Sequence, residues 1–262
     1  MLKFCSLYSG SSGNCLFVQS KGTKILIDCG TSLKKICEGL VSINSSIEEI
    51  DAILVTHEHS DHIQSLGLAS QKYDIPVFAN TETWDAIPNQ KQKIAPHNVN
   101  VFKNDKDFNI NELTIHPFSI PHDAVNPCGF NIHSGKKKIS IATDLGHINN
   151  KILKQLEKSS FILLESNYEP EILKVSKYPF FLKRRIAGPT GHLSNIEASQ
   201  TISSLIGKDL KEVMLGHLSK ENNIPELAYQ TVVNELIENN INTKNIKLSV
   251  ADRYSPSKVI TI

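Results

Sequence analysis

The sequence predicts an α+β protein in which two β-sheets pack face to face and helices cover the outside. Three observations favour this fold. Apolar runs of strand length recur along the chain, turn residues and helix-start signals separate them, and the pattern falls into two similar halves. No low-complexity segment, linker or solenoid repeat interrupts the 262 residues, so we expect one domain spanning residues 1–262.

Strands divided by turns dominate the first half of the chain. We expect strands at residues 2–8, 15–19, 23–28, 51–55 and 75–78. Ser46 and Glu49 have the spacing of a capping box, which predicts a short helix, and residues 63–71 can form another helix. Residues 99–143 are again rich in strands with turn residues between them.

The second half alternates strands with helices. We expect strands at residues 161–164, 213–215 and 246–250. Ser194 and Glu197 form a capping box that opens a helix extending to about residue 206. A further helix is expected at residues 225–238.

The composition is that of a globular protein with little net charge. Hydrophobic residues make up 40% of the chain, and 28 Lys and Arg against 27 Asp and Glu give a formal charge of +1. This balance excludes attraction of the whole surface to nucleic acid or anionic membranes, so such a partner would need a local patch. The longest apolar runs are far too short to span a bilayer, and we expect no membrane partner.

The five cysteines are odd in number, widely spaced and contain no C-x-x-C pair. This pattern argues against a disulfide framework and a structural zinc knuckle, and it favours a reducing compartment. The first residues lead directly into small polar residues, without the apolar core of a signal peptide. We therefore expect a cytoplasmic protein, whose oligomeric state the sequence leaves open.

The segment that carries chemistry runs from His57 to His62, directly after the strand expected at residues 51–55. His57 and His59 stand two residues apart, so in an extended backbone both side chains leave the same face. Asp61 and His62 follow a turn and can reach a second point nearby. Three imidazoles and one carboxylate suit Zn²⁺, with Mn²⁺ or Fe as alternatives, and mixed nitrogen and oxygen ligands indicate a catalytic site rather than a structural one.

Three further residues of ligand type follow later apolar runs, namely His122, Asp144 and His217. Each has the same context, because a short buried strand delivers one side chain to one end of the sheets. Taken alone, each is equally typical of a loop or capping residue. Together with the first segment they supply about as many ligands as two metal ions require.

The order of these residues resembles the five motifs of the metallo-β-lactamase superfamily, and Asp28 matches the early structural aspartate of that superfamily. The flanking sequences are similar to those of the YycJ/WalJ family of single-domain bacterial hydrolases, namely at residues 6–14, 164–167, 191–195 and 215–223. The resemblance covers nearly the whole chain. It implies a four-layer αββα sandwich with the site at one edge of the two sheets.

The resemblance also implies a ligand set for two divalent metal ions, Zn²⁺ or Mn²⁺. It places three histidines on one ion, two histidines and an aspartate on the other, and a second aspartate between them: His57, His59 and His122; Asp61, His62 and His217; Asp144. Two such ions lower the pKa of water enough to supply hydroxide near neutral pH, and they bind the oxygens of a phosphodiester. Asp61 is both a ligand and a candidate to orient the nucleophile.

His192 is the candidate general acid that protonates the leaving oxygen. It lies just before the capping box, near a helix N-terminus whose amides favour phosphate oxygens, and Ser194 is therefore a candidate for substrate binding. In related phosphodiesterases of the resembled superfamily, a histidine that is not a ligand has this role. His192 and His217 both occur in Gly-His-Leu-Ser, so they could exchange roles; we assign His217 as the ligand because a buried strand precedes it.

Residues 172–196 contain no acid, and Lys183, Arg184 and Arg185 lie there among aromatic residues. Such a stretch suits a phosphate backbone and a stacked base, although a solvated helix face with a buried aromatic edge is the alternative. Members of the resembled family are described as 5′→3′ DNA exonucleases, so the resemblance implies a phosphodiesterase that acts on DNA by metal-activated hydroxide attack.

Two other functions compete with this one. The same site could hydrolyse a small cyclic phosphodiester, a thioester or a lactone, and loss of DNA cleavage on neutralising the basic stretch would distinguish DNA from these substrates. A non-catalytic binding protein on the same fold is disfavoured, because such proteins usually lose ligands and every expected ligand is present here.

Overall fold

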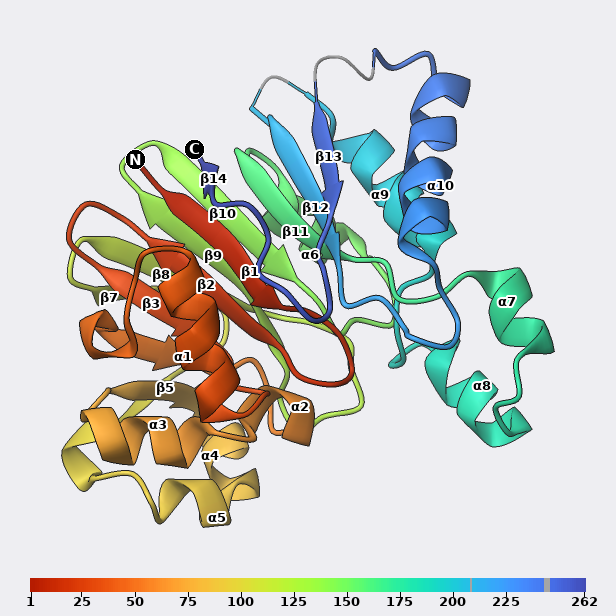
Figure 1. Cartoon of the computed structure of the whole chain (residues 1–262). Helices are drawn as coiled ribbons and strands as arrows, with labels where there is room; N and C mark the ends of the chain where they lie inside the picture. Colours follow the sequence, from red (N-terminus) through yellow and green to blue (C-terminus); the bar gives the residue numbers. More distant parts are fainter. Residues whose placement is uncertain (208, 243–245) are drawn as a thin grey trace.

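The chain folds into two seven-stranded sheets that pack face to face between outer helices (Figure 1). The computed structural model describes residues 1–207, 209–242 and 246–262. Both sheets are mixed, and the helices lie on the two outer faces. The predicted four-layer αββα sandwich is therefore confirmed. That residues 1–262 form one domain stays a prediction.

The first sheet has the strand order β14-β1-β2-β3-β4-β5-β6. Its strands, in chain order, are β1 (Lys3–Tyr8), β2 (Cys15–Gln19), β3 (Lys24–Ile27), β4 (Ala52–Leu54), β5 (Val77–Asn80), β6 (Val99–Phe102) and β14 (Ile260–Thr261). Strands β1 to β3 form an antiparallel meander, whereas β3 to β6 are parallel. The carboxyl ends of β3 and β4 therefore meet at one edge of the sheet.

The second sheet has the order β13-β12-β11-β10-β9-β8-β7. Its strands are β7 (Phe108–Ile110), β8 (Leu113–Ser119), β9 (Cys128–Ser134), β10 (Lys137–Ala142), β11 (Phe161–Glu165), β12 (Glu212–Gly216) and β13 (Lys247–Val250). Strands β7 to β10 are antiparallel and β10 to β13 are parallel. The carboxyl ends of β10, β11 and β12 thus also share one edge.

Helices on the outside bury one apolar face of each sheet. The helices that pack against the first sheet are α1 (Leu33–Ser42), α3 (Leu66–Tyr73) and α4 (Thr81–Ala86). Helix α5 (Pro88–Lys91) follows α4 in the chain. Against the second pack α6 (Asn150–Leu156), α9 (Asn195–Leu205) and α10 (Pro225–Glu238). The remaining helical segments are η1 (Ile47–Glu49), α2 (Ser60–Ile63), η2 (Pro96–Asn98), α7 (Pro170–Val175) and α8 (Phe180–Ile186).

The layer between the sheets is an apolar core to which both sheets contribute. The alternation of side chains along β3 shows how it forms, because Ile25 and Ile27 face the second sheet while Leu26 faces α1. Phe4 on β1 and Phe161 on β11 meet across the layer with ring centroids 4.6 Å apart. None of the helices in the described part of the chain is long and apolar enough to cross a membrane.

Every strand expected from the sequence is present, with bounds that differ by at most two residues. The helices at residues 195–205 and 225–238 are confirmed, and the capping box of Ser46 and Glu49 opens η1. The single helix expected at residues 63–71 is wrong in detail, because α2 and α3 are separate. The amide of Ser65 donates its hydrogen bond to the Cys29 carbonyl and not to a carbonyl of α2. Helix α2 therefore ends before Ser65.

Replacing Phe161 with alanine should remove a central contact between the two sheets. Phe161 is fully buried, and truncation of such a ring costs about 3–5 kcal/mol because the cavity collapses only in part. Urea unfolding followed by circular dichroism measures this loss. Phe181→Ala is the matched control, since Phe181 is 73% exposed and should change stability by less than about 0.5 kcal/mol. Equal stability of the two variants would contradict the assigned core.

Glu112 links two hairpins and should make stability depend on pH in the acid range. Hydrogen bonds from the hydroxyls of Ser20 and Thr23 lower the pKa of Glu112 to about 2. Because the folded-state pKa is depressed, this stabilisation is present above the unfolded pKa of about 4.5 and is lost as the pH falls towards 2.

The test compares thermal midpoints of the wild type and Glu112→Gln from pH 7 to pH 2.5. The wild type should be more stable at pH 7, and the difference should shrink between pH 4.5 and pH 2.5. The exposed Glu48→Gln serves as a control for general acid effects. A difference that is constant with pH would show that the carboxylate of Glu112 is not the cause.

Candidate metal centre

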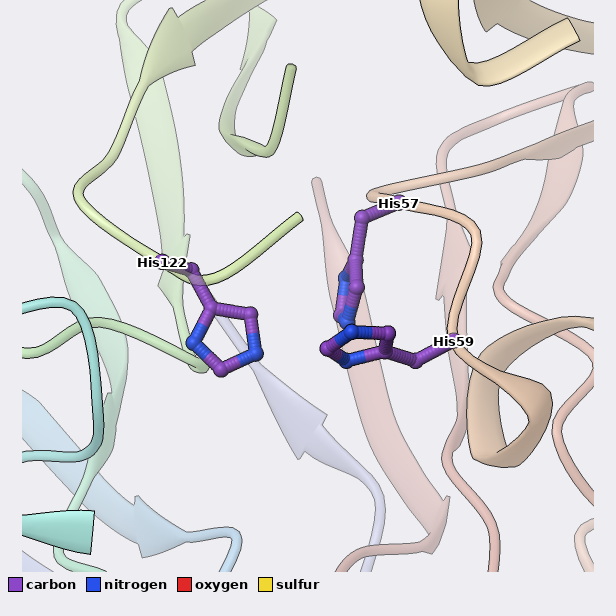
Figure 2. A group of neighbouring side chains, drawn as sticks. All are labelled: His57, His59 and His122. Carbon is purple, nitrogen blue, oxygen red and sulfur yellow. The ribbon is translucent and has the colours of Figure 1, made fainter. Parts of the chain in front are cut away.

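Three histidines from the two sheets face a shared space at one edge of the sandwich. His57 and His59 lie in the loop after β4, and His122 lies in the loop after β8. Figure 2 shows the three rings turned towards one another, with His122 approaching from the opposite side to the other two. Each ring offers one nitrogen atom, and these three atoms lie within 4.8 Å of one another. The predicted convergence of these three residues is therefore found.

A second group of possible ligand atoms lies beside the first. Asp61, His62 and His217 offer atoms within 4.8 Å of one another, and Asp144 forms a further such group with His57 and His62. One carboxylate oxygen of Asp144 lies 3.3 Å from His62 Nε2, and the other lies 3.4 Å from His217 Nε2 and 3.8 Å from His122 Nε2 of the first group. Asp144 thus lies between the two groups.

Two aspartates and one histidine at this edge have left-handed backbone conformations. Asp28, Asp144 and His217 have φ values of 63°, 58° and 54°. Each follows the end of a strand, β3, β10 or β12. Residues other than glycine adopt this conformation rarely, and such strain concentrates at functional sites. The turn directs each side chain out of its strand towards the shared edge.

Asp28 fixes the orientation of His62 from behind the centre. Its carboxylate accepts hydrogen bonds from the Thr56 amide at 2.9 Å and the Thr56 hydroxyl at 2.8 Å, and it lies 2.7 Å from His62 Nδ1. Because Nδ1 is engaged in this way, Nε2 of His62 is the ring atom that faces Asp144. A carboxylate behind a histidine in this manner fixes the tautomer and raises the basicity of the metal-facing nitrogen.

The backbone of Asp61 is held tightly by two neighbouring loops. The Asp61 carbonyl accepts a hydrogen bond of 2.8 Å from the Asn14 amide, and the Asn14 side chain lies 3.0 Å from His62 Nε2. A Cβ atom at position 30 would lie only 1.6 Å from the Asp61 carbonyl oxygen. Gly30 is therefore required by the close approach of the loop that carries Asp61, not by its own dihedral angles.

Glu165 is a site residue that sequence reasoning missed. It is fully buried at the end of β11, and its Oε1 atom lies 2.8 Å from His217 Nδ1 and 2.9 Å from His192 Nδ1. Its other oxygen accepts the amides of Leu145 and Leu193. The available signal was a single charged residue closing the apolar run Phe161–Leu164, the same context that identified Asp144.

The buried carboxylates of the centre stabilise positive charge on the groups around them. Burial acts to raise the pKa of Glu165, but the charges and hydrogen bonds of His192 and His217 outweigh it and hold that pKa at about 2. Burial acts to lower the pKa of His217, but Asp144, Asp61 and Glu165 together raise it to about 10. The pKa of Asp144 lies well below its usual range despite burial, because His217 and His62 lie close to it.

The side chains present fit a divalent metal ion. Nε2 of His57, His122 and His217 and Oδ2 of Asp144 are buried and have no hydrogen-bond partner in the described parts of the chain. A buried polar atom without a hydrogen-bond partner is costly, so four of them in overlapping groups of possible ligand atoms favour a bound cation. Imidazole and carboxylate donors together suit Zn²⁺, Mn²⁺ or Fe, and the opening beside Asp61, whose side chain is 25% exposed, leaves access from solvent.

His192 lies at the margin of this centre. Its Nδ1 atom lies 3.8 Å from Asp144 and its side chain is 17% exposed, whereas the side chain of His217 is 2% exposed. Burial acts to lower the pKa of His192, but Glu165 raises it above the ordinary value. His217 also belongs to the group with Asp61 and His62, while His192 does not. His192 and His217 share a further group with Asp144 and Glu165, and the assignment of His217 as the ligand stays a prediction.

The basic residues expected to bind substrate lie on α8, close to the centre. Lys183, Arg184 and Arg185 occupy its last turn, and the Nε atom of Arg185 donates to a carboxylate oxygen of Asp123, next to His122. Ser194 lies elsewhere. Its hydroxyl caps α9 by accepting from the Glu197 amide and donating to the Glu197 carboxylate, and it is buried. The substrate-binding role of Ser194 stays a prediction.

The two-sheet fold and the histidine and aspartate cluster at its edge define a metal-dependent hydrolase. Residues 23–217 match the family described as the beta-lactamase superfamily domain. The chain is 39% identical to the exodeoxyribonuclease WalJ of Streptococcus pneumoniae over 90% of this chain and 88% of that protein, and 32% identical to the exodeoxyribonuclease YycJ of Bacillus anthracis over 98% of each. The chain belongs to the β-lactamase superfamily, in the family of WalJ and YycJ.

Solved structures show the same fold at low sequence identity. The metallo-β-lactamase fold protein YhfI from Bacillus subtilis superimposes with a TM-score of 0.71 and 18% identity, covering 98% of each chain. The Zn²⁺-bound PqqB from Methylobacterium extorquens gives a TM-score of 0.71 at 12% identity, covering 98% of this chain and all of that one. The expected superfamily and the narrower family are both confirmed.

Replacing Glu165 with glutamine should weaken metal binding. An amide cannot accept hydrogen bonds from two imidazoles on one side and two backbone amides on the other, so the orientation of His217 is lost. Changes to such supporting partners typically cost 10- to 100-fold in metal affinity. Chelator competition measures the affinity, and elemental analysis measures the metal content.

Glu212→Gln is the matched control, because Glu212 starts β12 at the opposite end from His217. Its metal affinity should equal that of the wild type. Unchanged metal affinity in Glu165→Gln would contradict the supporting role of Glu165.

Proposed function

We propose that this protein is a dinuclear-metal phosphodiesterase that acts on nucleic acid as a 5′→3′ DNA exonuclease. The observation that carries the proposal is that four buried ligand atoms without hydrogen-bond partners belong to overlapping groups of possible metal ligands. Its substrate class is supported by the two relatives named exodeoxyribonuclease, which this chain matches over most of its length.

Two groups of side chains would each hold one divalent ion, Zn²⁺ or Mn²⁺. The first group is His57, His59 and His122, the second is Asp61, His62 and His217, and Asp144 lies between them. The contacts of Asp144 support this division, since its Oδ1 atom lies 3.8 Å from His122 Nε2 of the first group and 3.4 Å from His217 Nε2 of the second. When bound, such ions lower the pKa of water and neutralise charge on the oxygens of a phosphodiester.

Asp61 and His192 are the proposed catalytic side chains. Asp61 is the most exposed carboxylate of the centre, so it can orient the attacking nucleophile by accepting a hydrogen bond. His192 would donate a proton to the leaving oxygen. Its Nδ1 atom is bound to Glu165, which leaves Nε2 as the atom that carries the transferable proton, and the negative charge of Glu165 favours the protonated ring.

The cellular setting forms part of the same proposal. The five cysteines are unpaired, and four of them are buried. Unpaired buried thiols suit a reducing compartment, which supports a cytoplasmic protein. We also propose that residues 1–262 act as a single hydrolase domain.

Replacing His57 with alanine should abolish activity, because it removes one of the buried ligand nitrogens of the first group. The assay uses duplex DNA labelled at either end with Mn²⁺. Stepwise loss from the 5′ end that is absent in the variant would support the exonuclease. A different outcome is that the wild type binds two metal ions and hydrolyses a small chromogenic diester but fails to cut DNA. That result would instead favour a small cyclic phosphodiester, thioester or lactone as substrate.

Replacing His192 with alanine should lower turnover and keep the metal. Loss of a general acid typically costs about 10²- to 10⁴-fold in rate. Steady-state kinetics and metal analysis of the same preparation give both quantities. If His192→Ala loses a metal ion while His217→Ala retains both, the roles assigned to these two histidines are exchanged.

A further inference from the structure

The chain leaves the sandwich between two residues of the candidate centre and forms a protruding arm. The arm comprises α7 and α8, begins after Glu165 and returns at His192 (Figure 1). Its base is closed by two backbone hydrogen bonds, from the Asn167 amide to the Leu193 carbonyl and from the Asn195 amide to the Tyr168 carbonyl. The arm is therefore anchored at both ends beside the site.

The arm carries a cavity of about 450 Å³ that is open to solvent. Its lining includes the side chains of Tyr168, Leu173 and Tyr178, which belong to a small apolar cluster separate from the cores of the sandwich. A volume of this size lies within the range of small-ligand sites, 300–1,000 Å³, and accommodates a planar ring system. The cavity thus has the size and the aromatic lining that a nucleobase requires.

One side of this cavity is an exposed aromatic ring with a cation beside it. Phe180 lines the cavity and is 75% exposed, and the guanidinium of Arg184 lies 5.9 Å from its ring centroid. An exposed large apolar side chain marks a contact surface when other features of a site surround it. A base could stack on Phe180 in this arrangement, with Arg184 close to its phosphate.

The rim of the cavity is positively charged. Lys174, Lys183 and Arg184 line it, and residues 172–196 carry five Lys and Arg and no acid, whereas the whole chain has a formal charge of +1. Local positive charge on a nearly neutral protein is complementary to a polyanion. The neighbouring Arg185 is bound to Asp123, so the last turn of α8 contacts the loop that carries His122.

We propose that this cavity binds the base of an unpaired nucleotide adjacent to the scissile phosphodiester of a DNA strand. The proposal rests on the function proposed above and specifies its substrate. The base stacks against Phe180 and the tyrosines, and the flanking phosphates contact Lys183 and Arg184. A base in this cavity is not paired with a complementary strand, so the end of a duplex must open before it is cut.

The test measures binding of a fluorescent single-stranded oligodeoxynucleotide to the metal-loaded protein by anisotropy. Phosphorothioate linkages prevent cleavage. Phe180→Ala should weaken binding about 5- to 150-fold, the usual contribution of one stacked base. Phe181→Ala is the matched control, since Phe181 is a neighbouring phenylalanine of equal exposure, 73%, that does not line the cavity.

A second measurement places the base. Abasic residues are introduced one position at a time, and one position should lose affinity in the wild type but not in Phe180→Ala. Neutralising Lys183 and Arg184 should reduce the salt slope of log K by about 0.7 for each charge, whereas Lys136→Gln, in the hairpin between β9 and β10, should leave it unchanged.

Equal effects of Phe180→Ala and Phe181→Ala, or an abasic scan with no sensitive position, would overturn the proposal. The outcome for the proposed function is independent of this result. Phe180→Ala can lose oligonucleotide binding selectively while the wild type fails to cut end-labelled DNA. These two results together would support the base-binding role of the cavity and contradict the proposed exonuclease activity.

Discussion

Buried negative charge at the edge shared by the two sheets is the constraint on which the site depends. Asp28, Asp144 and Glu165 are each at most 3% exposed, and an isolated buried carboxylate is costly unless positive or polar groups compensate it. Here the compensation comes from His62, His192 and His217, which lie within 4 Å of these carboxylates. The same arrangement leaves other ring nitrogens pointing inwards without partners, and this asymmetry makes the centre suitable for a cation.

The sandwich brings these groups together through parallel pairing. Strands β3 and β4 end at the edge where β10, β11 and β12 also end, so residues more than a hundred positions apart meet without long loops. Left-handed turns at Asp28, Asp144 and His217 then direct the side chains inwards. The core between the sheets does not contact substrate; its role is to hold the two edges in register.

The sequence predicted most of the strands and the ligand-type residues for different physical reasons. An apolar run such as residues 161–164 indicates a buried strand, whichever neighbouring strands it is hydrogen-bonded to. Polar residues directly after such a run indicate where the strand ends. The position of Glu165 after an apolar run was a local signal, but its role depends on two histidines distant in the chain, and the local pattern does not report that role. The short helices α7 and α8 escaped prediction because six or seven residues are too few to show a helical period. Ser194 illustrates the opposite case, since its local capping pattern was correct and accounts for its hydroxyl.

The attachment of the arm at Glu165 and His192 has a consequence for how this architecture can diversify. Residues 170–184 of the arm lie outside every strand and precede Arg185 and Ile186, which contact Asp123 and His192, so insertions, deletions or replacements there leave these contacts and the strands in place. Under the role proposed for the arm, selection can act on recognition and on chemistry as separate traits. A scaffold divided in this way can acquire a new substrate by remodelling one short segment while its reactive centre is inherited intact.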